Sequence, residues 1–197
     1  MSDNLLVGLA GFARSGKDAA AQTLIEGGWR RDAFADRLKT FLYRQNPLVT
    51  TFPDAPPVRL ANLVNAIGWD EAKERYPEVR RLLHATGTDA GRATLGENVW
   101  IDALFNDYEP EREALVVSDV RFPNEARAVQ GRGGVVIWID RPGVGPARDE
   151  HGRPYSSEVA LANWKFDATL SNDGTLDDLR DRLLGVTTLA AQFLVAA

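Results

Sequence analysis

Near its beginning the chain carries a lysine at the end of a glycine-containing stretch, Gly11-Phe12-Ala13-Arg14-Ser15-Gly16-Lys17-Asp18. A loop of this kind can point several backbone N–H groups into one concavity, and its lysine can reach the outer phosphates of a bound group. These residue types therefore predict the binding of a polyphosphate nucleotide.

The segments on either side of this loop are the elements that such a site requires. The apolar run 5–10 predicts a buried strand before the loop, and the alanine-rich segment 18–26 predicts a helix after it. The start of that helix would add its positive dipole end to the loop amides. Strand, loop and helix together are the context of a phosphate-binding P-loop, or Walker A motif.

The residue after the lysine departs from the usual P-loop pattern. Serine or threonine generally stands there and binds Mg²⁺ through its hydroxyl, whereas this chain has Asp18. A carboxylate is a good ligand for a hard cation, so Asp18 is a candidate Mg²⁺ ligand. The alternative is that Asp18 only stabilises the first helical turn, where an acidic side chain contributes about 0.3–1 kcal/mol.

A second candidate site follows the apolar run 115–118, which predicts a central parallel strand. Ligands bind at the carboxyl end of such strands, and Asp119 and Arg121 come directly after this one. Asp119 would be a second Mg²⁺ ligand, or alternatively would cap the helix that begins at Pro123. Arg121 could bind a phosphate bidentately, or alternatively pair with Glu125 on the surface.

Further arginines fall in a long loop after the next predicted strand. This loop, about 141–155, is rich in glycine and proline and contains Arg141, Arg148 and Arg153. Phosphoryl transfer needs positive charge near the moving oxygens, so these arginines are candidates for a lid that closes over the phosphates. Each of them could instead be a solvated loop charge.

Several residues between the second and third predicted strands are candidates for binding a second nucleotide. Asp36 and Lys39 belong to the helix after the second strand, which would lie next to the P-loop in this topology. Arg92 follows glycines that weaken a plain helix, so another group is expected to pack closely there. Trp100 could stack on a base, although an aromatic residue at helical spacing is more often part of a core.

The rest of the chain alternates between predicted strands and helices, which predicts an α/β fold with a central parallel sheet. Further strands are expected at 30–34, 135–139 and 167–171. Further helices are expected at 36–45, 58–67, 77–86, 97–106, 123–130 and 175–184, and the proline-rich stretch 46–57 is expected to be irregular. A helical insert thus separates the second strand from the third.

Composition and charge limit the possible functions. The 197 residues suit one domain with a sizeable core, and a net charge of −5 argues against a general nucleic-acid binder. The absence of cysteine excludes disulfides and fits a reducing compartment. We expect a cytoplasmic protein without membrane contact, because no secretory signal or membrane span is recognised. The apolar segment 186–197 would form a final helix or a partner contact, so a homodimer is worth testing.

These motifs, in this order, resemble those of the phage-type deoxynucleoside monophosphate kinases, a branch of the P-loop nucleoside monophosphate kinases. The matching pieces include the Arg-Ser-Gly-Lys-Asp loop at 14–18 and the stretch 118–125, and their specific parts are Gly-Lys-Asp at 16–18 and Asp-Val-Arg-Phe-Pro-Asn-Glu at 119–125. Weaker matches, spread over nearly the whole chain, are Phe34-Ala35-Asp36, Leu38-Lys39, Leu82-Leu83, Gly87-Thr88-Asp89, Arg92, Trp100, Arg141-Pro142-Gly143, Ser157-Glu158 and Asn172-Asp173-Gly174.

The resemblance implies a single P-loop kinase domain over residues 1–197 with three α/β/α layers. Its core would cover about 1–45 and 113–197, its helical monophosphate-binding insert about 46–112 and its lid about 141–157. The implied reaction transfers the γ-phosphate of ATP to a deoxynucleoside 5′-monophosphate in the presence of Mg²⁺, in the host cytoplasm if the protein is viral.

The resemblance also assigns roles to residues at matching positions. ATP would be bound by Gly11, Arg14, Ser15, Gly16, Lys17, Asp18 and Asn172, with Mg²⁺ at Asp18 and Asp119. The monophosphate would be bound by Asp36, Lys39, Arg92, Trp100, Arg121 and Glu125. Lys17, Arg121 and Arg141 would act on the transferred phosphoryl group.

Two other functions stay open at this point. A kinase resembling dephospho-coenzyme A kinase would share the loop and the Asn-Asp-Gly ending at 172–174. A nucleotide-dependent switch or assembly ATPase would share the loop as well. The arginine-rich lid and the helical insert suit a second small substrate better than a partner protein.

Overall fold

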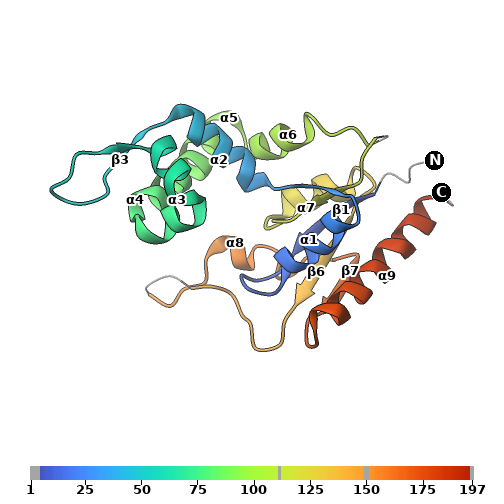
Figure 1. The fold of residues 1–197 in the computed structure, drawn as a ribbon. Helices are drawn as coiled ribbons and strands as arrows, with labels where there is room; N and C mark the ends of the chain where they lie inside the picture. The colour runs from blue at the N-terminus through green and yellow to red at the C-terminus, as the bar shows by residue number, and fades with distance from the viewer. Residues whose placement is uncertain (1–4, 111, 149–150, 196–197) are drawn as a thin grey trace. The chain divides into compact units, whose positions relative to one another are not determined.

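The computed structural model describes residues 5–110, 112–148 and 151–195 (Figure 1). Contacts among them divide the chain into two compact units. The first unit is built from the segments up to Phe34 and from Leu104 onward, and the second is Ala35–Ala103. The second unit is therefore inserted into the sequence of the first.

The first unit is built on a five-stranded parallel sheet with the strand order β2-β5-β1-β6-β7. The strands are β1 Leu6–Ala10, β2 Arg30–Asp32, β5 Leu115–Val117, β6 Val135–Asp140 and β7 Ala168–Ser171. Strands β1 and β5 are buried along their whole length. Burial on both faces is the reason that they occur as uninterrupted apolar runs in the sequence.

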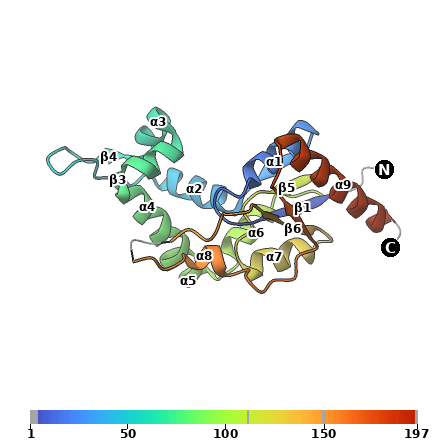
Figure 2. The ribbon, with the colours of Figure 1, turned by 90° about the horizontal axis from the view of Figure 1, so that it is seen from below.

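Helices cover both faces of this sheet. Helices α1 (Lys17–Glu26) and α9 (Leu176–Val195) contact each other and lie on one face, whereas α7 (Pro123–Gln130) lies on the other (Figure 2). The core under α1 and α9 includes Leu24 and Leu179 of these helices, together with strand residues such as Ile137. The expected α/β fold with three layers and a central parallel sheet is confirmed.

The carboxyl ends of the strands bring several candidate residues to one edge of the sheet. Strand β1 pairs in parallel with both β5 and β6, and β6 pairs in parallel with β7. The residues that follow these strands therefore share an edge. The loop 11–16 follows β1, Asp119 follows β5, Arg141 follows β6 and Asn172 follows β7.

The second unit is helical apart from one short hairpin. It contains most of α2 (Phe34–Gln45), the antiparallel strands β3 (Leu48–Val49) and β4 (Val58–Arg59), α3 (Leu60–Arg75) and α4 (Pro77–His84). The π-helix η1 (Ala85–Arg92), α5 (Ala93–Leu95) and most of α6 (Val99–Phe105) complete it. The unit has a core of its own, made of Leu42, Val49, Leu60, Ala72 and Val79.

Several elements differ from the sequence-based expectation. The helix expected at 58–67 begins at Leu60, because Val58 and Arg59 pair with β3, a strand that lies in the stretch expected to be irregular. That helix, α3, runs on to Arg75 across a kink at Gly68, which has a φ angle of 76°. The last helix does not stop near residue 184 but continues to Val195, so it includes most of the apolar segment at the end of the chain.

Across the described residues, every helix falls short of the length or the apolar character that a membrane span requires. The finer division expected from the sequence, with a monophosphate-binding insert at about 46–112 and a lid at about 141–157, stays a prediction. The segment after β6 leads into a short helix that the sequence did not predict, α8 (Ser156–Val159).

Candidate functional site

The loop 11–16, which we call the β1–α1 loop, has a conformation that depends on two glycines. Gly11 and Gly16 have φ angles of 144° and 105°, which other L-residues rarely adopt. A Cβ atom on Gly11 would lie 2.5 Å from the carbonyl oxygen of Ile139, and one on Gly16 would overlap Nδ2 of Asn172. Both the backbone angles and the close neighbours therefore require glycine at these positions.

Lys17 is folded back onto this loop. Its side-chain nitrogen Nζ donates hydrogen bonds to the carbonyl oxygens of Gly11, at 2.8 Å, and Phe12, at 2.6 Å. The residue is 8% exposed. Burial lowers the pKa of the ammonium group, and the positive charge of Arg121 lowers it further. The lysine therefore adds a largely desolvated positive charge to the loop.

Ser15 has an unusual environment for a polar residue. It is 1% exposed, and its Oγ has no hydrogen-bond partner among the described residues. Buried hydroxyl groups are nearly always hydrogen-bonded, because an unsatisfied one costs free energy. A ligand oxygen in the loop would supply the missing partner.

Asn172, which follows β7, holds the β1–α1 loop in place through its side-chain amide. Its Nδ2 donates to the carbonyl oxygen of Ser15 at 2.9 Å, and its backbone N–H donates to the carbonyl oxygen of Asp140 at 2.6 Å. Its side chain thus fixes the loop to the end of the sheet. The contact with ATP that the resemblance assigns to Asn172 stays a prediction.

Glu158 is the residue of this site whose role sequence reasoning missed. It lies in α8 and is 8% exposed. Its Oε2 accepts from the backbone N–H of Ala13 at 3.0 Å, and its Oε1 accepts from Nη1 of Arg121 at 2.7 Å. In the sequence, Glu158 appeared only as part of Ser157-Glu158, one of the weaker matches to the kinase family. Its contact with Ala13 could not be predicted, because no sequence spacing links residue 158 to residue 13.

Three carboxylates lie within electrostatic reach of Lys17. Their negative charges, those of Glu158, Asp18 and Asp119, all act to raise the pKa of the lysine, against the stronger effects of burial and Arg121. Asp18 is exposed in the first turn of α1. The structure therefore gathers both predicted metal ligands near the predicted catalytic lysine.

Asp119 also has a structural role at the end of β5. Its Oδ1 accepts from the backbone N–H of Phe34 at 2.8 Å, so it caps the start of α2. Helix α2 consequently begins before Asp36, which lies within its first turn and does not cap it. The role of Asp119 as a metal ligand stays a prediction.

Glu125 holds the backbone of Arg121 in place. Its Oε2 accepts from the N–H of Arg121 at 2.8 Å and from the N–H of Phe122 at 3.1 Å, and the residue is 3% exposed. These bonds fix the start of α7, where a carboxylate at the third helical position is favourable. The substrate contact assigned to Glu125 stays a prediction.

The remaining candidates for the monophosphate belong to the second unit. Lys39 pairs with Asp36 within α2, with 2.9 Å between Nζ and Oδ1. Arg92 ends the π-helix η1 and is half-buried. Helical stretches of this kind often occur at functional sites. The contacts of these three residues with a substrate stay predictions.

The expectation that other groups pack closely on the glycines of this segment is confirmed. A Cβ on Gly87 would lie 2.7 Å from Cδ2 of Leu38, and one on Gly91 would lie 2.8 Å from Cζ2 of Trp100. Trp100 is 6% exposed and donates from Nε1 to the carbonyl oxygen of Gly87 at 3.0 Å. It therefore occupies a packed position in the structure, and its stacking on a base stays a prediction.

Arg141, the predicted lid arginine, is exposed in the loop after β6. Further along this loop, the carbonyl oxygen of Ala147 accepts from the N–H of Tyr155 at 3.0 Å, and Nη1 of Arg148 donates to the carbonyl oxygen of Gly152 at 2.7 Å. These bonds join Ala147 to Tyr155 and Arg148 to Gly152 within the later part of the loop. The closure of this loop over phosphates stays a prediction.

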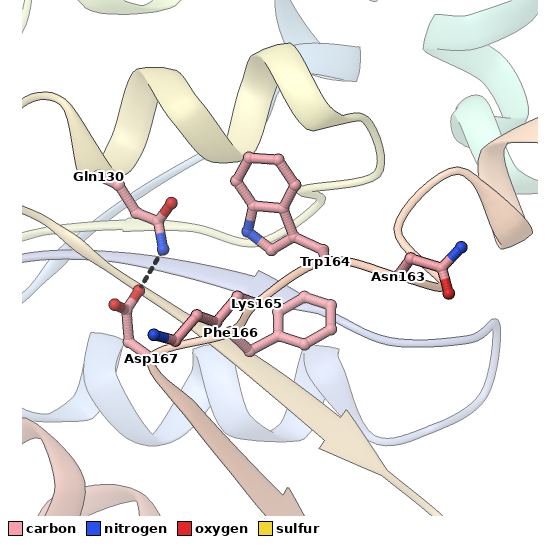
Figure 3. A pocket seen from close by; sticks show the side chains of 6 residues that line it. All are labelled: Gln130, Asn163, Trp164, Lys165, Phe166 and Asp167. Carbon is pink, nitrogen blue, oxygen red and sulfur yellow. Dashed lines mark hydrogen bonds between the residues drawn. The ribbon is translucent and has the colours of Figure 1, made fainter.

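A separate pocket lies at the opposite edge of the same sheet. It is lined by Gln130, Asn163, Trp164, Lys165, Phe166 and Asp167 (Figure 3). Gln130 ends α7 and donates to Asp167, which precedes β7, at 2.8 Å. The end of α7 and the start of β7 mark the amino edge of the sheet, so this pocket is not part of the site around the β1–α1 loop.

Comparisons with known proteins bear on the family of this chain. Among solved structures, the dephospho-CoA kinase from Campylobacter jejuni aligns with a TM-score of 0.49 and 14% identity, covering 95% of this chain and 97% of that one. Shikimate kinase from Aquifex aeolicus aligns with a TM-score of 0.45 and 12% identity, covering 94% and 96%. These likenesses are too low to support an argument.

The sequence comparisons are more informative. A protein of Acanthamoeba polyphaga mimivirus named "Putative deoxynucleotide monophosphate kinase" is 29% identical over 210 residues, which cover 95% of this chain and 98% of the relative. The model of the deoxynucleotide monophosphate kinase family matches residues 58–183, well over half of the chain. The chain therefore belongs to the deoxynucleotide monophosphate kinase family and is a phosphotransferase.

Proposed function

We propose that this protein transfers the γ-phosphoryl group of ATP to a deoxynucleoside 5′-monophosphate, so that ADP and the deoxynucleoside diphosphate are formed. The observation that carries the proposal is the β1–α1 loop at the carboxyl edge of the sheet, with Lys17 folded onto it and Arg121 held beside it. A glycine loop with a lysine at a helix start suits a polyphosphate.

The residues of the loop fit the phosphates of ATP. Ser15 Oγ is buried without a hydrogen-bond partner among the described residues, and Lys17 provides a desolvated positive charge. Backbone N–H groups at the start of α1 would bind the same oxygens, assisted by the helix dipole. Arg14 is exposed on the loop, and Asn172 fixes the loop to the sheet, so both are well placed for the ATP side.

The donor set also fits Mg²⁺ bound together with the nucleotide. Asp18 and Asp119 offer hard carboxylate oxygens near Lys17. The described residues contain no group of three or more acidic, histidine or cysteine side chains that could hold a metal alone, so phosphate oxygens would complete its ligands. When bound, the metal would neutralise phosphate charge.

The protein groups would act by holding charge and orientation. Lys17 and Arg121 would stabilise the negative charge on the oxygens of the transferred group, which is the main requirement of phosphoryl transfer. Arg121 would face the acceptor, and Arg141 would approach when the loop closes. Asp36, Lys39, Arg92, Trp100 and Glu125 are proposed to bind the monophosphate.

A coupled assay with ATP, Mg²⁺ and each natural deoxynucleoside monophosphate tests this function, with ribonucleoside monophosphates as controls. We expect diphosphate formation that depends on the acceptor. ATP consumption at the same rate with and without deoxynucleotides would refute the kinase function. Arg121→Ala should impair use of the monophosphate more than the binding of ATP, measured by calorimetry; an equal loss of both would place Arg121 on the ATP side.

A further inference from the structure

We infer that Glu158 is a positioning residue of the phosphoryl-transfer site, whose carboxylate fastens the guanidinium of Arg121 to the backbone of the β1–α1 loop. The inference rests on the function proposed above. Glu158 would not touch the substrates; it would act through Arg121.

The contacts of Glu158 connect three segments that are far apart in the sequence. One carboxylate oxygen, Oε1, pairs with Nη1 of Arg121 at 2.7 Å. The other, Oε2, accepts from the N–H of Ala13 at 3.0 Å and from the N–H of Ala147 at 3.4 Å. A single side chain thus ties the segment after β5 and the loop after β6 to the β1–α1 loop.

The carboxylate is held firmly because it is buried and ionised. The Glu158 side chain is 4% exposed. Burial alone would raise its pKa, but the hydrogen bonds from the Ala13 amide and the Arg121 guanidinium outweigh this effect and lower the pKa. A buried charge is tolerated only in a well-defined set of partners, so these contacts define the position of Arg121.

The pairing leaves Arg121 able to bind a phosphate. A guanidinium group has five N–H donors, and the contact with Glu158 uses Nη1. The Arg121 side chain is 36% exposed, so part of it faces solvent. The charge of Glu158 also offsets the repulsion between two cations, since the charge of Arg121 acts to lower the pKa of Lys17 and that of Glu158 acts to raise it.

The first test compares Glu158→Gln with the wild-type enzyme. Glutamine keeps the shape of the side chain but removes the charge that holds Arg121. We expect kcat to fall about 100-fold, a loss that a displacement of about 1 Å in a positioned group can cause, with the KM for ATP changed by less than about threefold. Glu26→Gln is the matched control, because Glu26 forms a surface ion pair with Arg180 at 3.7 Å; its kcat should stay at the wild-type value.

A second test asks whether Glu158 acts through Arg121. If it does, the double variant Glu158→Gln/Arg121→Ala should be no slower than Arg121→Ala alone, because coupled residues are not additive. Independent, multiplied losses would overturn the inference. A hydrogen-exchange measurement at the Ala13 amide should show faster exchange in Glu158→Gln than in the wild type, and unchanged exchange would also overturn it.

The possible outcomes distinguish this inference from the proposed function. A wild-type enzyme that phosphorylates no deoxynucleotide would refute the proposed function itself. An active wild type with an equally active Glu158→Gln variant would refute only the positioning role. A variant that is faster than the wild type, or binds ATP more tightly, would mean that the carboxylate competes with phosphate for the Ala13 amide, which also overturns the inference.

Discussion

Replacing Gly16 by alanine should damage the β1–α1 loop through two separable effects. The φ angle of 105° is unfavourable for an L-residue, at a cost of about 1–2 kcal/mol. The new Cβ would also overlap Nδ2 of Asn172 and displace its hydrogen bond to the Ser15 carbonyl oxygen. Leaving a buried acceptor unpaired costs about 1–3 kcal/mol. We therefore expect the free energy of unfolding to fall by about 2–5 kcal/mol.

Two single variants measure these effects one at a time. Gly28 also has a positive φ angle, 89°, but a Cβ there would meet nothing within 4 Å. Gly28→Ala should therefore show the backbone strain alone, about 1–2 kcal/mol. Asn172→Ala should show the loss of the hydrogen bond alone, about 1–3 kcal/mol. Urea unfolding followed by tryptophan fluorescence gives each value by linear extrapolation.

The double variant Gly16→Ala/Asn172→Ala decides whether the reasoning is correct. Once Asn172 is truncated, the alanine at position 16 has nothing to overlap, so only the backbone strain should be added. The loss in the double variant should thus fall short of the sum of the two single losses by about 1–3 kcal/mol. Losses that add within about 0.5 kcal/mol would refute the proposed clash.

Four further predictions concern the site and the packing of two helical glycines. Lys17→Ala should lower the rate of transfer by about 100- to 1000-fold, and near-normal turnover in the coupled assay would refute its placement at the phosphates. Gly91→Ala should lower the free energy of unfolding by about 1–3 kcal/mol through overpacking, because its Cβ would lie 2.6 Å from the carbonyl oxygen of Thr86 and 2.8 Å from the Trp100 ring. A Cβ on Gly185, in α9, would meet nothing within 4 Å, so Gly185→Ala should raise the free energy of unfolding by about 0.5–1 kcal/mol. Urea unfolding that shifts the stability of Gly91→Ala and Gly185→Ala in the same direction would contradict these two predictions. The pKa of Glu158 is lowered from 4.5 in the folded state, so its stabilising contribution is complete above that value and is lost as the pH falls through the lower folded pKa. A pH series of urea unfolding should therefore show a smaller acid loss for Glu158→Gln than for the wild type.

Much of the fold was predictable because its signals are local. The strand before the β1–α1 loop, the helix after it and the helix at Pro123–Gln130 follow from short apolar runs and from turn and capping residues. The hairpin of β3 and β4 was missed, because two-residue strands leave no periodic pattern. Close packing at Gly87 and Gly91 could be predicted from the glycines, but the partners Leu38 and Trp100 could not.

Some features of the candidate site could likewise be predicted from the sequence, and others could not. Gly11, Gly16 and Lys17 could be assigned from one short stretch, because a loop between a strand and a helix has to satisfy its own backbone angles and the lysine lies next to it. Asp119 could be placed at the correct sheet edge from its position after a strand, but its bond to the amide of Phe34 depends on a contact between distant segments.

Local chemistry along the chain was thus sufficient to predict the glycine loop before α1, the parallel sheet and the edge at which they meet. The role of Glu158 emerged only in three dimensions, since its partners at residues 13, 121 and 147 are joined to it by folding and not by spacing. A buried carboxylate acquires its charge state and its orientation from the amides and the guanidinium that surround it, and those neighbours assemble only when the strands pair side by side.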